Sequence, residues 1–242
     1  MDKRFLIVIP ARYKSSRFPG KPLVEISGKS MIQRVWEKCV QASNEQNVVV
    51  ATDDNRIMQH CESHGMNAVM TSEDCLTGTD RVSEVSKALN ADFYINVQGD
   101  EPLLDPSDIK KVIDAYLSDP SFTYCAMTKI SSSNDYNNRN IPKVVCSEDK
   151  VLMYISRAGI PSNKEGSTLS TMKQVCIYAF PKNHLKEYGL DKKKSELEKY
   201  EDIEILRLIE KGYGVKMVEL SSSTIAVDTK EDLEKVILKL NG

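Results

Sequence analysis

Short apolar runs alternate with longer amphipathic segments over the first half of the chain. Three runs of mostly Val, Ile, Leu and Phe have the nearly unbroken pattern typical of strands buried on both faces. They cover residues 5–9, 47–51 and 93–97. Four segments between and after them repeat apolar residues with the period of a helix. They cover residues 30–42, 54–64, 79–89 and 106–117. This order predicts a parallel sheet with crossover helices on its faces.

The pattern changes after about residue 121 to short extended runs separated by polar loops. These runs cover residues 123–130, 143–146, 151–155 and 175–180. The tail returns to α/β texture, with a charged helix at 197–211, strands at 215–220 and 225–227, and a helix at 229–240. Thr229 and Asp232 are spaced as a capping box for that last helix. We expect one α/β domain, with a parallel-sheet half at 1–120, an inserted mixed-sheet lobe at about 121–180 and a closing segment at 181–242.

Composition narrows the class of protein. A chain of 242 residues is long enough to bury a core without disulfides, and its net charge of −2 gives no general attraction to nucleic acid or to an anionic membrane. No stretch approaches the roughly 18 apolar residues of a membrane-spanning helix. The six cysteines have no paired or regular spacing, which favours free thiols and a cytoplasmic protein.

The strongest chemical signal follows the first predicted strand. Residues 9–23 place four cations among two serines and a Pro-Gly turn, and the cations are Arg12, Lys14, Arg17 and Lys21. Because open α/β folds bind ligands where strands end, this loop predicts a site for a polyphosphate. It carries neither of the common glycine-rich phosphate motifs. The alternative is a solvated basic loop.

Carboxylates follow two other apolar runs. Asp100 comes after Gly99 at the end of the third strand, and Asp228 stands between a short apolar run and a predicted helix. If the fold brings them together, they would bracket one divalent cation that holds phosphate oxygens. An ordinary polar loop remains an alternative for Asp100, and helix capping remains one for Asp228.

Two weaker signals accompany these. The segment 77–81 starts a helix with hydroxyls and a glycine, which suits either a helix cap or hydrogen bonds to a ribose or base. Arg157 ends a predicted strand near a turn and is a candidate partner for a carboxylate. An arginine at a strand end is also common without such a role.

Taken in order, the motifs resemble one enzyme family. They read I-P-A-R-x-x-S-S-R-x-P-G-K-P-L, A-T-D-D, G-T-D-R, N-V-Q-G-D-E-P, K-V-V, S-R-x-x-I-P and V-D-T-x-E-D-L-E. The chain is similar, from about residue 5 to 236, to the 3-deoxy-manno-octulosonate (Kdo) cytidylyltransferases among the CMP-sugar-acid synthetases. The resemblance implies a Rossmann-like nucleotidyltransferase fold and a cytoplasmic homodimer.

The resemblance also implies the reaction and the roles of single residues. The anomeric hydroxyl of a 2-keto-3-deoxy sugar acid would attack the α-phosphate of CTP and release pyrophosphate, with Mg²⁺ as cofactor. CTP would be bound by Ala11, Arg12, Ser16, Arg17, Lys21, Thr79 and Arg81. Asp100 and Asp228 would hold the metal and, with Arg17 and Lys21, form the catalytic set. The sugar acid would contact Gln98, Arg157, Tyr178, Glu201 and Glu204 in the half that includes the inserted lobe.

The chain departs from the family pattern only outside the CTP-side motifs. Gln174 replaces a usual histidine, Cys176 a glycine, and Ile205 a glutamine, while Ala226 replaces the glycine before V-D-T. Such changes could be neutral or could select a related acid, such as 8-amino-Kdo, another ulosonate or, with less support, a sialic acid. The lipopolysaccharide or capsule pathway is equally open.

Two other functions deserve comparison. A sugar-1-phosphate nucleotidyltransferase would need a G-x-G-x-R type of opening, which the chain lacks. A non-catalytic sugar-nucleotide-binding domain would not need Lys21, Asp100 and Asp228 together.

Overall fold

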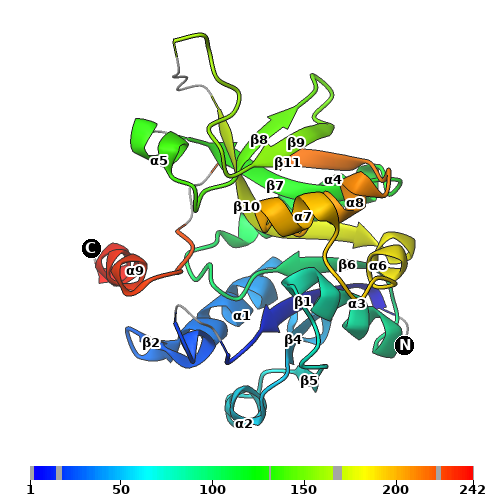
Figure 1. Cartoon of the computed structure of the whole chain (residues 1–242). Helices are drawn as coiled ribbons and strands as arrows, with labels where there is room; N and C mark the ends of the chain where they lie inside the picture. The colour runs from blue at the N-terminus through cyan, green and yellow to red at the C-terminus, as the bar shows by residue number, and fades with distance from the viewer. Residues whose placement is uncertain (1–2, 15–17, 131, 166–170, 222–224, 242) are drawn as a thin grey trace.

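A computed structural model describes residues 3–14, 18–130, 132–165, 171–221 and 225–241. Its centre is a nine-stranded sheet (Figure 1) whose main path runs β11-β7-β10-β6-β1-β4-β5. Strand β10 is antiparallel to both neighbours, whereas β6, β1, β4 and β5 are mutually parallel. The predicted α/β class with a mainly parallel sheet is confirmed.

The elements have the following bounds. The strands of the large sheet are β1 (Lys3–Ala11), β4 (Val48–Thr52), β5 (Ala68–Met70), β6 (Ala91–Val97), β7 (Thr123–Lys129), β8 (Lys143–Cys146), β9 (Leu152–Ser156), β10 (Met172–Pro181) and β11 (Val215–Glu219). A small hairpin pairs β2 (Glu25–Ile26) with β3 (Lys29–Ser30). The helices are α1 (Met31–Ala42), α2 (Asn55–Ser63), α3 (Gly78–Ala88), α4 (Pro106–Ser118), α5 (Ser133–Asn137), α6 (Lys182–Tyr188), α7 (Glu196–Glu201), α8 (Leu206–Glu210) and α9 (Lys230–Asn241). Short 3-10 turns cover η1 (Lys21–Leu23) and η2 (Glu45–Asn47).

Two apolar cores lie on opposite faces of the sheet. Alternate side chains of β1 point to opposite faces of the sheet. Ile7 and Ile9 lie on the face covered by α1, α2 and α4. Leu6 and Val8 lie on the face covered by α3, α6 and α8. All four side chains are fully buried, which explains why the strand reads as a continuous apolar run.

A third, smaller cluster holds the C-terminal helix. Val236 of α9 packs with Ile26 of β2, Met31 of α1, Phe18 and Val227. Figure 1 shows α9 beside the β2 hairpin, away from the layers that flank the sheet. This contact fixes the segment just before α9, which carries Asp228.

Two predicted elements differ from the structure. The helix predicted at 197–211 is divided into α7 and α8, because Asp202 has a left-handed φ of 51° that ends α7. The short strand predicted at 225–227 is wrong, since those residues belong to no strand. Strand β5 and helix α6 were not predicted, as both are too short for a clear periodicity.

The capping box before α9 is confirmed, because Asp232 N donates to Thr229 Oγ1 at 3.2 Å and Thr229 N donates back to Asp232 Oδ2 at 3.1 Å. Segment 121–180 supplies β7 and β10 to the central sheet, and only the β8–β9 hairpin extends beyond its main path. All six cysteines are free thiols. Among the described residues, no helix combines the length and apolar character that crossing a bilayer requires.

Candidate active site

One ammonium group joins the two predicted metal-binding aspartates. Lys21 Nζ donates to Asp100 Oδ2 at 2.8 Å and to the Val227 carbonyl at 2.8 Å, and it lies 3.5 Å from Asp228 Oδ1. All three side chains are partly buried. The structure therefore brings together three residues that are far apart in the sequence.

The local sequence explains how Lys21 reaches this position. Gly20 has a φ of 72°, a conformation that a glycine adopts without steric cost, and it precedes η1. A hydrogen bond from Gly20 N to the Tyr13 carbonyl at 3.0 Å closes the loop that leaves β1. This turn directs Lys21 back toward the end of β6.

A backbone contact aligns the two aspartates. Val227 N donates to the Asp100 carbonyl at 2.9 Å, and the Val227 side chain is fully buried in the cluster below α9. At Gly99, a Cβ atom would lie only 3.0 Å from the Pro10 carbonyl, so a side chain there would push the ends of β1 and β6 apart. Close packing of these three segments places the carboxylates side by side.

The three oxygen atoms around Lys21 Nζ suit a hard divalent cation. Two carboxylates and a carbonyl are ligands that Mg²⁺ accepts, with phosphate oxygens and water completing its shell. Within the described ranges, no group of three or more His, Cys, Asp or Glu side chains could hold a metal by itself. The residues present therefore fit a metal that arrives with a phosphate ligand.

A cavity of about 200 Å³ adjoins Lys21 at the carboxyl edge of the sheet. It is lined by residues 10–12, 21–22, 75–78, 81, 98–100 and 228. Ala11, Arg12, Arg81 and Gln98 thus lie around one space with the lysine and the aspartates. Cys75 and Leu76 also line it, although no pattern in the sequence singled them out.

Arg81 lies in the cavity wall with its side chain almost fully buried. Its Nη2 donates to Asp53 Oδ2 at 3.0 Å, and its Nη1 donates to Thr71 Oγ1. Asp53 belongs to the A-T-D-D motif, which begins inside β4 and continues just past its end. This ion pair fixes Arg81 where β4 and β5 end.

Thr79 differs from Ala11, Arg12, Lys21 and Arg81, the other predicted CTP contacts among the described residues, because it does not line the cavity. It is 1% exposed, its N–H donates to Glu204 Oε2 at 2.9 Å, and its Oγ1 accepts from Asn96 Nδ2 at 3.3 Å. Gln98 Nε2 donates to the other oxygen of Glu204 at 2.9 Å. Burial raises the pKa of Glu204, against the lowering effect of these donors.

Gly78 makes room for that arrangement. A Cβ atom at this position would lie 2.4 Å from Gln98 Nε2, so any other residue would displace the amide. Glu204 therefore links the start of α3 to Gln98, and through Gln98 to the cavity.

Arg157 and Glu201, both predicted sugar contacts, lie against each other. Glu201 accepts from Ser156 Oγ at 2.6 Å and from Arg157 N at 2.8 Å. The Arg157 guanidinium donates to the carbonyls of Glu201, Asp202 and Arg139. These contacts hold Arg157 at the carboxyl end of α7.

Two of the residues that depart from the family pattern, Gln174 and Cys176, lie on β10 with Tyr178. The hydroxyl of Tyr178, a buried side chain, accepts from Gln174 Nε2 at 2.9 Å, and the same amide lies 3.6 Å from Cys125 Sγ. The pairing of β10 with β7 shifts register between Val175 and Tyr178, which gives Cys176 an irregular stretch of strand. Burial raises the pKa of the Cys176 thiol well above its usual value.

The predicted site residues thus fall into three groups: those that surround the cavity, those that lie outside its lining, and those outside the described residues. Lys21, Asp100, Asp228, Ala11, Arg12, Arg81 and Gln98 surround one cavity. Thr79, Arg157, Tyr178, Glu201 and Glu204 lie outside its lining, although Glu204 contacts Gln98. Ser16 and Arg17 lie outside the described residues. Their individual roles stay predictions.

A mainly parallel sheet with a basic turn and paired aspartates at its carboxyl edge has its polar groups where open α/β folds bind nucleotides. A profile of the family described as Cytidylyltransferase matches residues 6–223. The chain therefore belongs to the cytidylyltransferases, and within them to the family of 3-deoxy-manno-octulosonate cytidylyltransferases.

The relatives behind that assignment match nearly end to end. The 3-deoxy-manno-octulosonate cytidylyltransferase of Syntrophotalea carbinolica is 40% identical, covering 97% of this chain and 98% of its own. The Escherichia coli protein of the same name is 38% identical, with 96% and 94% covered.

A solved CMP:2-keto-3-deoxy-manno-octonic acid synthetase complexed with CTP has a TM-score of 0.91 at 38% identity, and 99% of each chain is covered. The family and the nucleotidyltransferase fold implied by the motifs are confirmed.

Proposed function

We propose that this protein transfers a cytidylyl group from CTP to Kdo, with Mg²⁺ as cofactor and pyrophosphate as the second product. The observation that carries the proposal is the meeting of Lys21, Asp100 and Asp228 at the edge of a cavity that also exposes Arg12. The names of the relatives and the CTP complex of the similar structure support both substrates.

Electrostatic repulsion between the two anionic substrates is the main obstacle to the reaction. The anomeric oxygen of the acceptor forms a bond to the α-phosphorus, and the bond from that phosphorus to the oxygen of the β-phosphate breaks. Pyrophosphate leaves with the bonding electron pair, and the hydroxyl proton passes to solvent. An anionic acid must approach an anionic triphosphate, so cations around the phosphates supply most of the catalysis. Among the described cations, Lys21 lies at both aspartates, while Arg12 and Arg17 would hold the outer phosphates.

Asp100 and Asp228 would hold Mg²⁺, which, when bound, polarises the α-phosphate and neutralises part of its charge. The position of Lys21 Nζ, 2.8 Å from Asp100 Oδ2 and 3.5 Å from Asp228 Oδ1, supports a cation site at these carboxylates. We assign Lys21 to the transferring phosphoryl group once the nucleotide is present, because its flexible side chain can turn from Asp228 to a phosphate oxygen.

The remaining predicted residues divide between the two substrates. Ala11, Ser16 and Arg81 would contact CTP, whereas Thr79 would act through Glu204. Gln98, Arg157, Tyr178, Glu201 and Glu204 would surround the sugar acid, with Arg157 as the partner of its carboxylate. Of these, only Gln98 lines the cavity, and it contacts Glu204.

The test is a pyrophosphate-release assay with CTP, Mg²⁺ and a panel of sugar acids that includes Kdo, 8-amino-Kdo and sialic acids. We expect Kdo to give the highest kcat/KM, and omission of Mg²⁺ to abolish release. Asp228→Asn should lose release while retaining its fold, whereas Asp114→Asn, at an exposed position of α4, should not change it. Unchanged turnover in Asp228→Asn would contradict the metal assignment.

The panel also separates the alternatives. A higher kcat/KM for 8-amino-Kdo would assign the acceptor to that acid, as the departures at Gln174 and Cys176 allow. Binding of CTP without pyrophosphate release from any acid would indicate a non-catalytic domain. Light scattering tests the homodimer, and localisation of a tagged chain tests the cytoplasmic site of action.

A further inference from the structure

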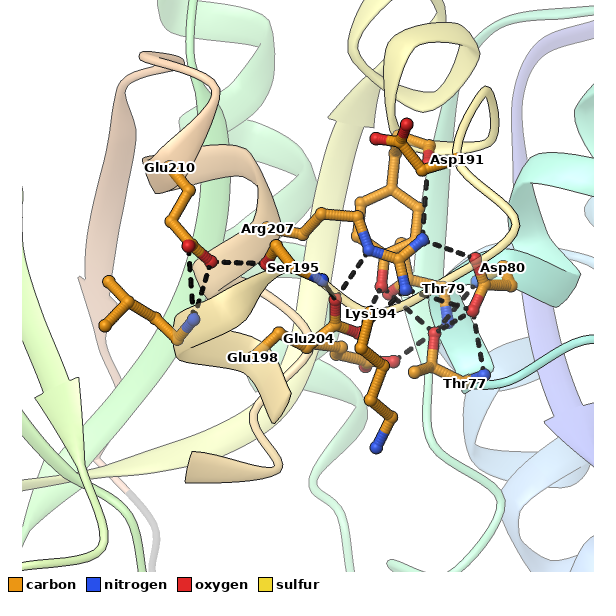
Figure 2. A network of polar contacts seen from close by, with 12 residues as sticks. Thr77, Thr79, Asp80, Asp191, Lys194, Ser195, Glu198, Glu204, Arg207 and Glu210 are labelled. Atoms are coloured by element: carbon orange, nitrogen blue, oxygen red, sulfur yellow. Dashed lines mark hydrogen bonds and ion pairs between the residues drawn. The ribbon is translucent and has the colours of Figure 1, made fainter. Parts of the chain in front are cut away.

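A fully buried arginine connects the two sides of the site. Arg207, at the start of α8, is 0% exposed and lies between two carboxylates from different segments (Figure 2). Its Nε and Nη2 donate to Glu198 of α7 at 2.6 and 2.8 Å, and its Nη1 donates to Asp80 of α3 at 2.7 Å. One guanidinium thus makes a bidentate contact on one side and a short contact on the other.

Asp80 connects Arg207 to the nucleotide cavity. Asp80 Oδ2 accepts from Thr77 N at 2.9 Å and from Thr77 Oγ1 at 2.8 Å, which closes the capping box of α3. Thr77 and Gly78 line the cavity beside Lys21. The position of this wall therefore depends on the carboxylate that Arg207 holds.

Glu198 connects Arg207 to the proposed acceptor side. It is fully buried in α7, the helix whose last residue is Glu201. The Glu201 carboxylate accepts from Arg157 N, and the carbonyls of Glu201 and Asp202 accept from the Arg157 guanidinium. A shift of α7 would therefore move Arg157.

The surroundings of Arg207 leave it little freedom. The Tyr188 ring lies 3.9 Å from the guanidinium carbon, and the Tyr188 carbonyl accepts from Nη1 at 3.3 Å. Burial lowers the pKa of Arg207, but hydrogen bonds to Glu198 and Asp80 outweigh burial and hold that pKa above its ordinary value. The group stays charged at any physiological pH.

We propose that Arg207 is a positioning residue that fixes the distance and angle between the nucleotide cavity and Arg157. This inference rests on the proposed function, in which Arg157 binds the carboxylate of the acceptor. Phosphoryl transfer requires the attacking oxygen to be aligned with the bond that breaks, and small misplacements reduce the rate strongly. Arg207 touches neither the cavity nor any reacting atom, so it acts through Asp80 and Glu198.

The main test compares Arg207→Lys with wild type. Lysine keeps the charge but cannot bind both carboxylates in the same geometry. We expect KM for Kdo to rise about tenfold and kcat to fall about tenfold. The Kd for CTP with Mg²⁺, measured by calorimetry, should change far less, because Arg12 and Lys21 hold the nucleotide from other segments. Glu198→Gln should reproduce this split between the two substrates.

Two matched controls separate positioning from general stability. Glu37→Gln changes a carboxylate of α1 that pairs with Lys29, on the opposite face of the sheet from α8, so its kinetic constants should stay at wild-type values. Val112→Ala creates a cavity in the core beside α4 and should lower the melting temperature without changing KM. Arg207→Lys constants that match those of Val112→Ala would overturn the proposal.

A second readout needs no turnover. In hydrogen exchange, Arg207→Lys should expose the Arg157 and Thr79 amides, which donate to Glu201 and Glu204, while Glu37→Gln should leave both protected. Unchanged protection in Arg207→Lys overturns the inference even if the enzyme is active. Absence of turnover in wild type, with this exchange pattern present, would instead contradict the proposed function.

Discussion

The proposed nucleotide side and the proposed acceptor side of the molecule use charge in different ways. Around the cavity, the exposed Arg12 and the single ammonium of Lys21 face a space that a ligand can fill. On the other side, Arg157 is bound to three carbonyls and Glu204 to two donors within the protein. One region presents its charges to a ligand, and the other uses them to hold its own shape.

This difference has a physical reason. A triphosphate brings its own negative charges, so a nucleotide site can keep cations close to water until the ligand arrives. A smaller sugar acid offers hydroxyls and one carboxylate, and recognising it depends on fixed donor and acceptor positions. Substitutions in the first region should reduce turnover directly, whereas those in the second should alter which acid is preferred.

The largest expected effect follows from removing the cation between the aspartates. Lys21→Met should reduce kcat by about 10²–10³-fold, since one charged donor to the transition state is lost. Pyrophosphate release at saturating CTP and Kdo measures it. Lys29→Met, which removes an exposed lysine paired with Glu37, is the control. A Lys21→Met rate within a few-fold of wild type would end the assignment of Lys21 to the transferring group.

A smaller effect is expected at the acceptor side. Gln174→His restores the family residue beside Tyr178 and replaces the amide that donates to its hydroxyl. The ratio of kcat/KM for Kdo and for 8-amino-Kdo should shift by about tenfold, while KM for CTP stays unchanged. Gln33→His, the same change on α1, controls for the new imidazole. An equal effect on CTP would show that the two regions are not separate.

The smallest effect concerns a residue outside both regions. His184 of α6 is buried, its Nδ1 lies 2.9 Å from Thr123 Oγ1, and burial lowers its pKa from the ordinary 6.5. As the pH falls, the His184 imidazole is therefore protonated at a higher pH in the unfolded chain than in the folded protein. The free energy of unfolding should decrease as the pH falls below 6.5, by at most about 1.4 kcal/mol per pH unit.

Urea unfolding of wild type and His184→Gln at several pH values tests this. The difference in unfolding free energy between the two proteins should change with pH, and kcat of the folded enzyme should not. If the difference in unfolding free energy between the two proteins does not change below pH 6.5, His184 has the same pKa in the folded and unfolded states.

Much of the fold could be predicted from the sequence because it depends on local periodicity. The apolar runs matched β1, β4 and β6, and the helical segments matched α1 to α4 within a residue or two. The division of 197–211 could not be predicted, since nothing in its composition excludes one continuous helix. Burial of Ile203, Ile205 and Arg207 against α3 and α6 decides it.

For the candidate site, too, some features could be predicted from the sequence and others depend on the tertiary structure. The order and chemistry of residues along the chain determined the family, the basic turn after β1 and the two aspartates, because a short motif places its own side chains relative to one strand end. Only the tertiary structure decided that Lys21 meets Asp100 and Asp228, which are 79 and 207 positions away. It also decided that Arg207 holds Asp80 across 127 positions. Such contacts depend on the packing of whole segments, which no local pattern contains.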